Sequence, residues 1–206
     1  KSSYTVRAQR RDPDEVDVDF ALHGVAPSSS TCSAAPAGPA SAWAAATRPG
    51  DRVILLGPAV QDNRSVCFRP PAGTDWVLIA ADETALPAAA GILDHLPPGL
   101  RARVWIEVPH AEDIQDLTVS PETDITWLVR DGVTTPSPLI EAVRAATLPD
   151  GAPYAWIAGE SGTVKTLRRH LVGERGLDRR TVTFSGYWRR GASEEDLRAE
   201  ALTGGS

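Results

Sequence analysis

The sequence contains no methionine, two cysteines and four histidines among its 206 residues. Cys32 and Cys67 form no CxxC pair, so neither a disulfide framework nor a cysteine zinc site is indicated, and a reducing cytoplasm fits. The histidines are scattered without HExxH spacing, and we expect no metal site built from protein ligands.

Long apolar runs and excess positive charge are also absent. No stretch reaches the roughly 20 apolar residues of a membrane span, and no signal peptide is visible. The formal net charge is -6, which argues against general nucleic-acid binding because phosphate neutralisation needs a basic surface. The length suits one large domain or two small ones.

The first part of the chain has the patterns of β-structure. Residues 4–9 and 15–22 alternate between apolar and polar side chains around a turn at Asp12-Pro13-Asp14, which predicts a half-buried antiparallel hairpin. Residues 26–37 are small and polar and predict a loop. A short helix is expected from Gly38, with Pro39 near its first position, and a further strand at residues 52–56.

After Pro70-Pro71 the pattern changes to strands that alternate with helices, which predicts a parallel sheet covered on both faces. Four of the strands carry a tryptophan, for which packing between sheet and helices is the simplest interpretation. The expected strands are residues 76–81, 102–108, 124–130, 154–158 and 181–185, and the expected helices are residues 84–96, 138–146 and 160–173, with a weak helical signal at 111–117.

Ligands of open parallel sheets bind beyond the carboxyl ends of the strands, so the residues at those ends are candidates for a binding site. Asp82 and Glu83 end the first apolar strand just before a helix, a junction that suits an anion, although such junctions also occur for packing reasons alone. Their side chains are adjacent and are expected to diverge, so they are not interpreted as a glycosidase-type pair.

Together these segments resemble the siderophore-interacting protein family of FAD-dependent ferric-siderophore reductases. Seven segments in order, from Tyr4 to about Gly191, carry the resemblance: YTVR, VDFALHG, GPASAW, GDRVILLGP, DETALPA, AGES and GYWRRG. It implies a ferredoxin-reductase-like fold, with part of an antiparallel FAD-binding β-barrel at residues 1–71 and a five-stranded parallel NAD(P)-binding-like α/β domain at residues 72–206. Because the first barrel strands are absent from this chain, we expect the natural protein to have more residues before Lys1.

The resemblance also implies roles for individual residues, none of them directly catalytic. Those expected to bind the cofactors are Tyr4 and Thr5 against the isoalloxazine, Arg7 near the FAD phosphates, His23 from the second strand, Gly38, Pro39, Ala40 and Ser41 around the pyrophosphate, Asp82, Glu83 and Thr84 where flavin and nicotinamide meet, Gly159 and Glu160 beside the nicotinamide nucleotide, and Trp188 at the flavin. The cations expected to face the ferric siderophore are Lys165, Arg168, Arg189 and Arg190.

The expected reaction passes electrons from NADH, NADPH or a ferredoxin-type carrier through FAD to Fe(III), which releases Fe(II) from the siderophore. Glu107, at the end of the second parallel strand, is a candidate acceptor for a ribose 2′-hydroxyl, which would favour NADH. One departure from the family pattern is Ser2, where an arginine is usual, so the FAD phosphate loses one cation. The alternative function is a non-catalytic module that binds a siderophore or a nucleotide.

Overall fold

The computed structural model describes residues 2–22, 38–58, 60, 67–132 and 137–192. His23, the predicted loop at residues 26–37 and the tail at residues 193–206 lie outside the described residues.

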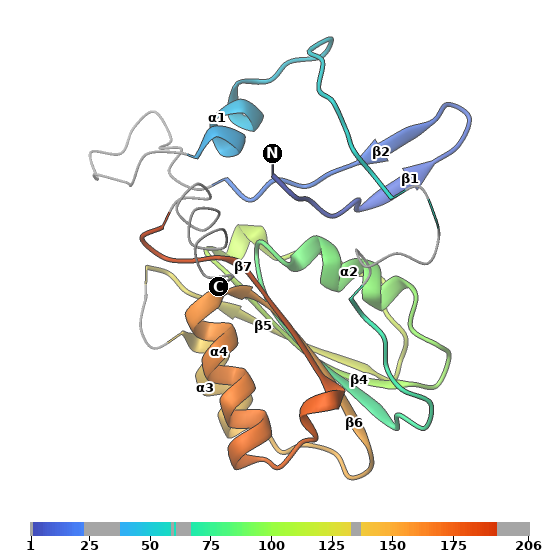
Figure 1. Ribbon diagram of the computed structural model, residues 1–206, viewed down its shortest axis with the longest axis vertical. Helices are drawn as coiled ribbons and strands as arrows, with labels where there is room; N and C mark the ends of the chain where they lie inside the picture. Colours follow the sequence, from blue (N-terminus) through green and yellow to red (C-terminus); the bar gives the residue numbers. More distant parts are fainter. Residues whose placement is uncertain (1, 23–37, 59, 61–66, 133–136, 193–206) are drawn as a thin grey trace, which may run out of the picture.

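A five-stranded parallel sheet forms the main body of the described chain (Figure 1). Its strands lie in the order β5-β4-β3-β6-β7, so the chain leaves β3 on one side and returns to β6 on the other. The expected parallel sheet is thereby confirmed. The strand bounds are Trp76–Asp82 (β3), Arg101–Val108 (β4), Thr123–Val129 (β5), Pro153–Glu160 (β6) and Val182–Trp188 (β7).

Helices cover both faces of this sheet, as the alternating pattern predicted. Both α2 and α3 carry a proline in the first turn, where the ring costs no helical hydrogen bond. The weak helical signal after β4 corresponds to a single 3₁₀ turn. The bounds are Leu86–Asp94 (α2), Ala111–Asp113 (η1), Pro138–Ala145 (α3), Ser161–Arg169 (α4), His170–Glu174 (η2, π-helical) and Arg179–Thr181 (η3).

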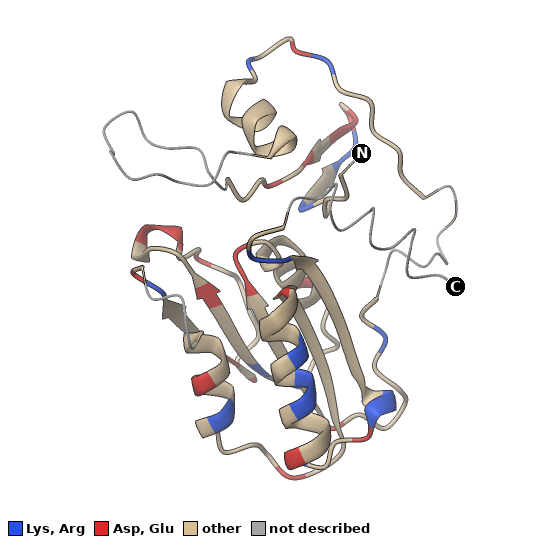
Figure 2. Ribbon diagram, turned by 60° about the vertical axis from the view of Figure 1, so that its left-hand side comes forward, with Lys and Arg blue, Asp and Glu red and all other residues tan. Residues whose placement is uncertain are grey.

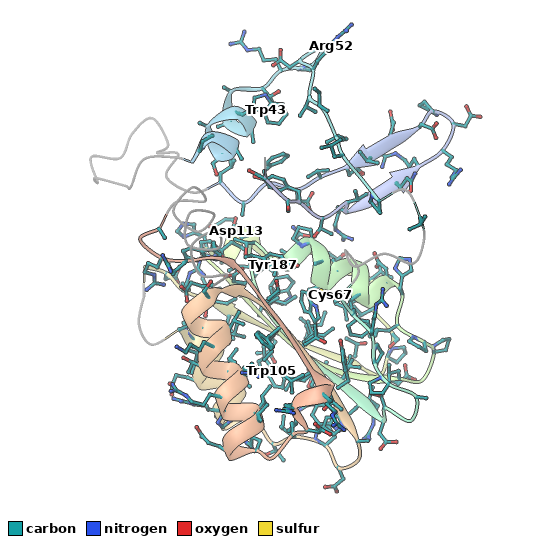
Figure 3. All side chains as sticks on the ribbon, in the orientation of Figure 1. Trp43, Arg52, Cys67, Trp105, Asp113 and Tyr187 are labelled. Atoms are coloured by element: carbon teal, nitrogen blue, oxygen red, sulfur yellow. The ribbon has the colours of Figure 1, made fainter. Side chains whose placement is uncertain are left out.

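The strict alternation of side chains along the strands divides the core into two layers. On β3, Val77 and Ile79 pack toward α2, whereas Trp76 and Leu78 pack toward α3 and α4. Trp156 lies in the first layer, and Trp105, which Figure 3 shows within the α/β unit, lies in the second. The tryptophans therefore fill the space between sheet and helices, as predicted.

The N-terminal unit contains much less regular structure than the sequence predicted. Its two-stranded sheet covers only Ala8–Arg10 (β1) and Glu15–Asp17 (β2), followed by the expected helix at Pro39–Ala46 (α1). The predicted strand at residues 52–56 is wrong: this segment forms no strand, and its side chains are exposed, with Ile54 at 89%. An apolar segment of this kind needs strand neighbours, and the described residues provide none.

Residues 67–71 connect the two units along the α2 face of the sheet. The Phe68 ring meets the Tyr154 ring edge-on at 5.3 Å, and Trp156 Nε1 donates to Cys67 Sγ at 3.3 Å. Figure 1 shows that the N-terminal unit faces the carboxyl edge of the parallel sheet. Arg7 Nη1, which lies 3.3 Å from Asp94 Oδ2 on α2, adds an ion pair between the units.

Candidate functional site

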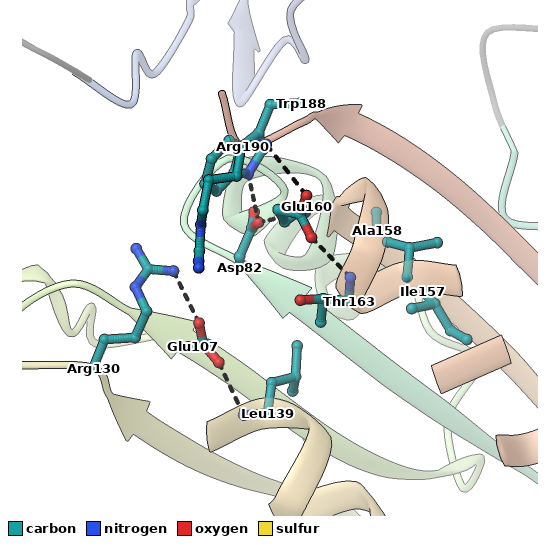
Figure 4. A pocket seen from close by; sticks show the side chains of 11 residues that line it. Asp82, Glu107, Arg130, Leu139, Ile157, Ala158, Glu160, Thr163, Trp188 and Arg190 are labelled. Carbon is teal, nitrogen blue, oxygen red and sulfur yellow. Dashed lines mark hydrogen bonds and ion pairs between the residues drawn. The ribbon is translucent and has the colours of Figure 1, made fainter. Parts of the chain in front are cut away.

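The carboxyl ends of β3 and β6 meet at the point where the strand order reverses, which is where open α/β sheets bind ligands. Acidic side chains from three neighbouring strands line this point. Figure 4 shows the Asp82 and Glu160 side chains next to each other, with Glu107 directed toward Arg130 and Leu139. They enclose a cavity of about 10 Å³, which is room for no more than about one water molecule. Little free space therefore remains between the side chains that line this cavity.

Asp82, the last residue of β3, is buried and accepts four hydrogen bonds. Oδ1 accepts from the backbone N–H and the hydroxyl of Thr84, and Oδ2 accepts from Glu160 N at 2.7 Å and from Trp188 Nε1 at 2.8 Å. Burial raises the pKa of Asp82, and the neighbouring Glu83 raises it further, against the effect of these donors. The carboxylate ties the ends of β3, β6 and β7 together.

Glu83 turns away from Asp82, as the adjacent positions suggested, and binds Arg130 at 2.6 Å. The same guanidinium contacts Glu107 Oε1 at 2.9 Å. Burial lowers the pKa of Arg130, but the two carboxylates outweigh it and raise the value. Glu83 Oε2 is buried with no hydrogen-bond partner among the described residues, so it can accept one more donor.

Glu107 is not available as the ribose acceptor that its strand-end position suggested. It is 4% exposed, and its second oxygen accepts from the Ser137 hydroxyl and from Leu139 N at the start of α3. The carboxylate thus acts as an internal anchor between β4, α3 and Arg130. This result corrects the expectation that Glu107 reads the nucleotide.

Glu160 occupies the junction between β6 and α4. Its Oε2 accepts from Thr163 N at 2.8 Å, which caps the helix, and its Oε1 accepts from Arg190 N at 3.3 Å. Gly159 has a φ of +139°, and a Cβ there would lie 2.5 Å from the Asp82 carboxyl group. Glycine is therefore required by the close approach of Asp82.

Aromatic rings and a helix N-terminus form a second group of candidate residues in the N-terminal unit. The Tyr4 ring, 44% exposed, lies 4.4 Å from the Phe20 ring, and Phe20 contacts Trp43 of α1 at 5.8 Å. The first turn of α1 has no acidic residue, and its N-cap, Gly38, provides no side-chain cap. This arrangement leaves the positive end of α1 suited to an anion, with a planar ring nearby.

Two other predicted residues of this unit have partners within the chain. The Arg7 guanidinium lies 3.3 Å from Asp94 and 3.9 Å from Asp19, so its charge is shared with two carboxylates. The Ser41 hydroxyl donates to Ala21 O at 3.5 Å. Thr5, Pro39 and Ala40 are partly buried or exposed in the same unit.

The four predicted cations do not form one cluster. Arg189 and Arg190 follow β7 at the carboxyl edge, where Arg190 lines the small cavity. Lys165 and Arg168 lie along α4, and Figure 2 shows basic residues following this helix away from that edge. The Arg168 guanidinium covers the Phe184 ring at 4.4 Å.

Sequence reasoning missed Arg130, which binds Glu83 and Glu107, and Ser137, which donates to Glu107. Arg130 follows directly after β5, so its strand-end position was a usable signal. Ser137 was less visible because its partner Glu107 lies 30 residues earlier in the chain.

Within the described ranges, no group of three or more His, Cys, Asp or Glu side chains could hold a metal ion. No helix in the same part of the chain is long and apolar enough to cross a membrane.

Comparisons with known proteins match both units. The siderophore-interacting FAD-binding domain matches residues 1–62, and the siderophore-interacting protein model matches residues 74–191. Together with the parallel sheet, these matches confirm the expected fold class, an FAD-binding β unit followed by a parallel α/β unit.

Individual relatives align with nearly the whole chain. The ferric vibriobactin reductase ViuB of Vibrio cholerae is 32% identical over 200 residues, which are 96% of this chain and 68% of ViuB. An uncharacterized protein of Mycobacterium tuberculosis is 34% identical over 205 residues, 94% of this chain and 66% of that protein. The chain thus spans about two thirds of the length of these relatives.

The solved structure of the siderophore-interacting protein SipS from Aeromonas hydrophila superposes with a TM-score of 0.70 at 32% identity. The match covers 92% of this chain and 73% of SipS. It includes both the β unit and the parallel sheet.

Proposed function

The chain belongs to the siderophore-interacting protein family, and from this premise we propose that it is part of an FAD-dependent ferric-siderophore reductase. The observation that carries the proposal is the similarity to ferric vibriobactin reductase, which runs through both units of the chain. The division into an FAD-binding domain at residues 1–71 and an NAD(P)-binding-like domain at residues 72–206 is part of the proposal.

The N-terminal unit supplies groups that fit FAD. Tyr4 presents an exposed ring on which an isoalloxazine can stack, with Thr5 next to it. The uncapped N-terminus of α1, formed by Gly38, Pro39, Ala40 and Ser41, suits the pyrophosphate better than the start of α2, which follows Asp82 and Glu83. Arg7 adds a cation already shared with two acids.

In this proposal the carboxyl edge of the parallel sheet forms the other side of the cofactor site, facing the N-terminal unit. Trp188 ends β7 at this edge, and Gly159 of β6 lets the Asp82 carboxyl group that binds its indole approach the backbone. Glu83 and Thr84 lie in the turn after β3 at this edge, where the proposal has flavin and nicotinamide meet. When bound, FAD supplies the redox chemistry, taking electrons from a hydride donor or a one-electron carrier and passing single electrons to Fe(III).

The substrate is a ferric siderophore, whose Fe(III) is held by hard oxygen ligands of the chelator. Arg189 and Arg190, next to Trp188, offset the negative charge of such a complex. Lys165 and Arg168 on α4 would attract the ferric siderophore at longer range, through the positive electrostatic potential that their charges produce.

The electron donor is NADH, NADPH or a reduced ferredoxin-type protein in the cytoplasm. Because Glu107 is fully engaged with Arg130, Ser137 and Leu139, it provides no basis for a preference between the two nicotinamide cofactors. Flavin reduction rates with each donor measure this preference directly.

The alternative function is a module that binds the siderophore or a nucleotide without electron transfer. The test uses the full-length protein: flavin absorbance should be present after purification, bleach with the donor under anaerobic conditions and recover on addition of a ferric siderophore. A colourless protein that still binds the ferric siderophore would support the binding module and overturn the reductase proposal.

A further inference from the structure

Trp188 is held at two separate points. Its backbone carbonyl accepts from the Ser161 hydroxyl at 2.8 Å, and its indole N–H donates to Asp82 Oδ2 at 2.8 Å. One contact fixes the end of β7 against the start of α4, and the other fixes the ring relative to β3. With both ends held, the plane of a partly exposed ring is restricted to a narrow range.

Two glycines in register make both contacts possible. Gly159 of β6 pairs with Gly186 of β7. A Cβ at Gly159 would lie 2.5 Å from the Asp82 carboxyl group, and a Cβ at Gly186 would lie 2.5 Å from Ser161 Oγ. Gly159 therefore leaves space for Asp82, and Gly186 leaves space for Ser161, the two residues that bind Trp188. The paired glycines on adjacent strands thus allow both contacts to form.

The Asp82 carboxylate has no capacity for a further ligand. It is 4% exposed, and its two oxygens already accept four hydrogen bonds. Three of the donors belong to Thr84, in the turn after β3, and to Glu160, the last residue of β6. The fourth is the indole of a residue 106 positions later, at the end of the strand next to β6. Because a buried acceptor is costly to leave without its donor, this hydrogen bond restricts the orientation of that ring.

We infer that Asp82 is a positioning residue, which holds the indole of Trp188 in a fixed orientation at the carboxyl edge instead of contacting a cofactor itself. The consequence for flavin chemistry rests on the proposed function, in which Trp188 borders the flavin. Asp82 then determines the orientation of the indole ring relative to the flavin. It also fixes the position of the backbone from which Arg189 and Arg190 continue.

The test follows the Trp188 indole directly in the full-length, FAD-loaded protein labelled with ¹⁵N. Its N–H resonance is identified by its loss in Trp188→Phe. In Asp82→Ala we expect this resonance to shift and to exchange with water at least about tenfold faster, because the acceptor is gone, while the other indole resonances stay in place. Asp124→Asn, an exposed acid of β5, is the control with the same loss of charge.

A second readout links the indole to the flavin. Trp188→Phe and Asp82→Ala should change flavin emission in the same direction, and the double variant should add little to either, because both remove one interaction. If Asp82→Ala does not fold, Asp82→Ser serves instead, since it also removes the carboxylate oxygen that accepts from the indole but keeps a polar side chain.

An unchanged Trp188 resonance and exchange rate in a folded Asp82 variant would overturn the inference. Additive effects on flavin emission would overturn its extension to the flavin. Failure of the proposed function is separate, since a protein that binds no FAD still reports the indole resonance.

Discussion

Arg130 Nη1 lies 2.9 Å from Glu107 Oε1, which joins the carboxyl ends of two neighbouring strands beneath a nearly closed surface. The same arginine binds Glu83, so one cation serves two largely buried carboxylates at the centre of the candidate site. The same charge pairing between exposed side chains would contribute little to stability, and this difference can be measured.

The first prediction concerns stability at this cluster. Arg130→Met should lower the free energy of unfolding by about 3–5 kcal/mol, because it leaves Glu83 and Glu107 buried without their cation. The matched control is Arg103→Met, which breaks the exposed Arg103–Asp124 pair on the same two strands and should cost at most about 1 kcal/mol. Urea denaturation of both variants gives the comparison, and equal losses would contradict the role assigned to Arg130.

The second prediction concerns pH. Since burial and Glu83 raise the pKa of Asp82, the folded protein holds this proton more tightly than the unfolded chain. Its contribution to stability is therefore complete below the ordinary aspartate pKa of about 3.9 and is lost as pH rises through the higher folded value. The difference in unfolding free energy between wild type and Asp82→Asn should fall with rising pH and then level off.

Asp17 provides a control of opposite sign for that experiment. Its hydrogen bond with Arg10 lowers its pKa, so its contribution should be present at neutral pH and lost as pH falls. Urea titrations of Asp17→Asn and Asp82→Asn across the same pH series should slope in opposite directions. A difference for Asp82 that grew with rising pH would show that its donors outweigh its burial.

The third prediction uses two Gly→Ala changes. Gly159→Ala should destabilise the protein by more than about 2 kcal/mol, because its φ is +139° and the new Cβ would meet Asp82. Gly91→Ala, within α2 and with no described atom within 4 Å of its new Cβ, should be stabilising by about 0.5–1 kcal/mol. Chemical denaturation of both variants tests whether position 159 requires a residue without a Cβ atom.

The fourth prediction concerns the ferric siderophore. Arg189→Ala should raise the half-saturating siderophore concentration about fivefold while flavin content stays intact, as expected for the loss of about 1 kcal/mol of charge attraction. Arg179→Ala, before the start of β7 and about 20 Å away along the strand, is the control for overall charge. Identical values for wild type and Arg189→Ala would remove Arg189 from the substrate site.

The parallel sheet could be predicted from the sequence because its central strands are apolar on both faces and its strands alternate with helices. The strand at residues 52–56 could not, since Val53 to Leu56 have strand-like side chains but lack described neighbours with which to pair. Local pattern decides an element only where tertiary contacts agree with it.

The candidate site was predicted in position but not in its internal bonding. Asp82 and Glu83 lie at the strand end, and their side chains diverge as expected, while their role toward a cofactor stays a prediction. Which donors they meet depends on Arg130, Glu160 and Trp188, and strand order alone brings these residues together. The same contacts show that Glu107, a plausible ligand by position, is an internal anchor.

All buried apolar residues of the described chain lie between Trp76 and Val182, and the residues before Trp76 contribute none. The two units should therefore differ in their susceptibility to proteolysis. Cleavage is expected to begin in the exposed segment around Ile54 at low enzyme concentration, while the parallel sheet survives as a resistant fragment until it unfolds globally.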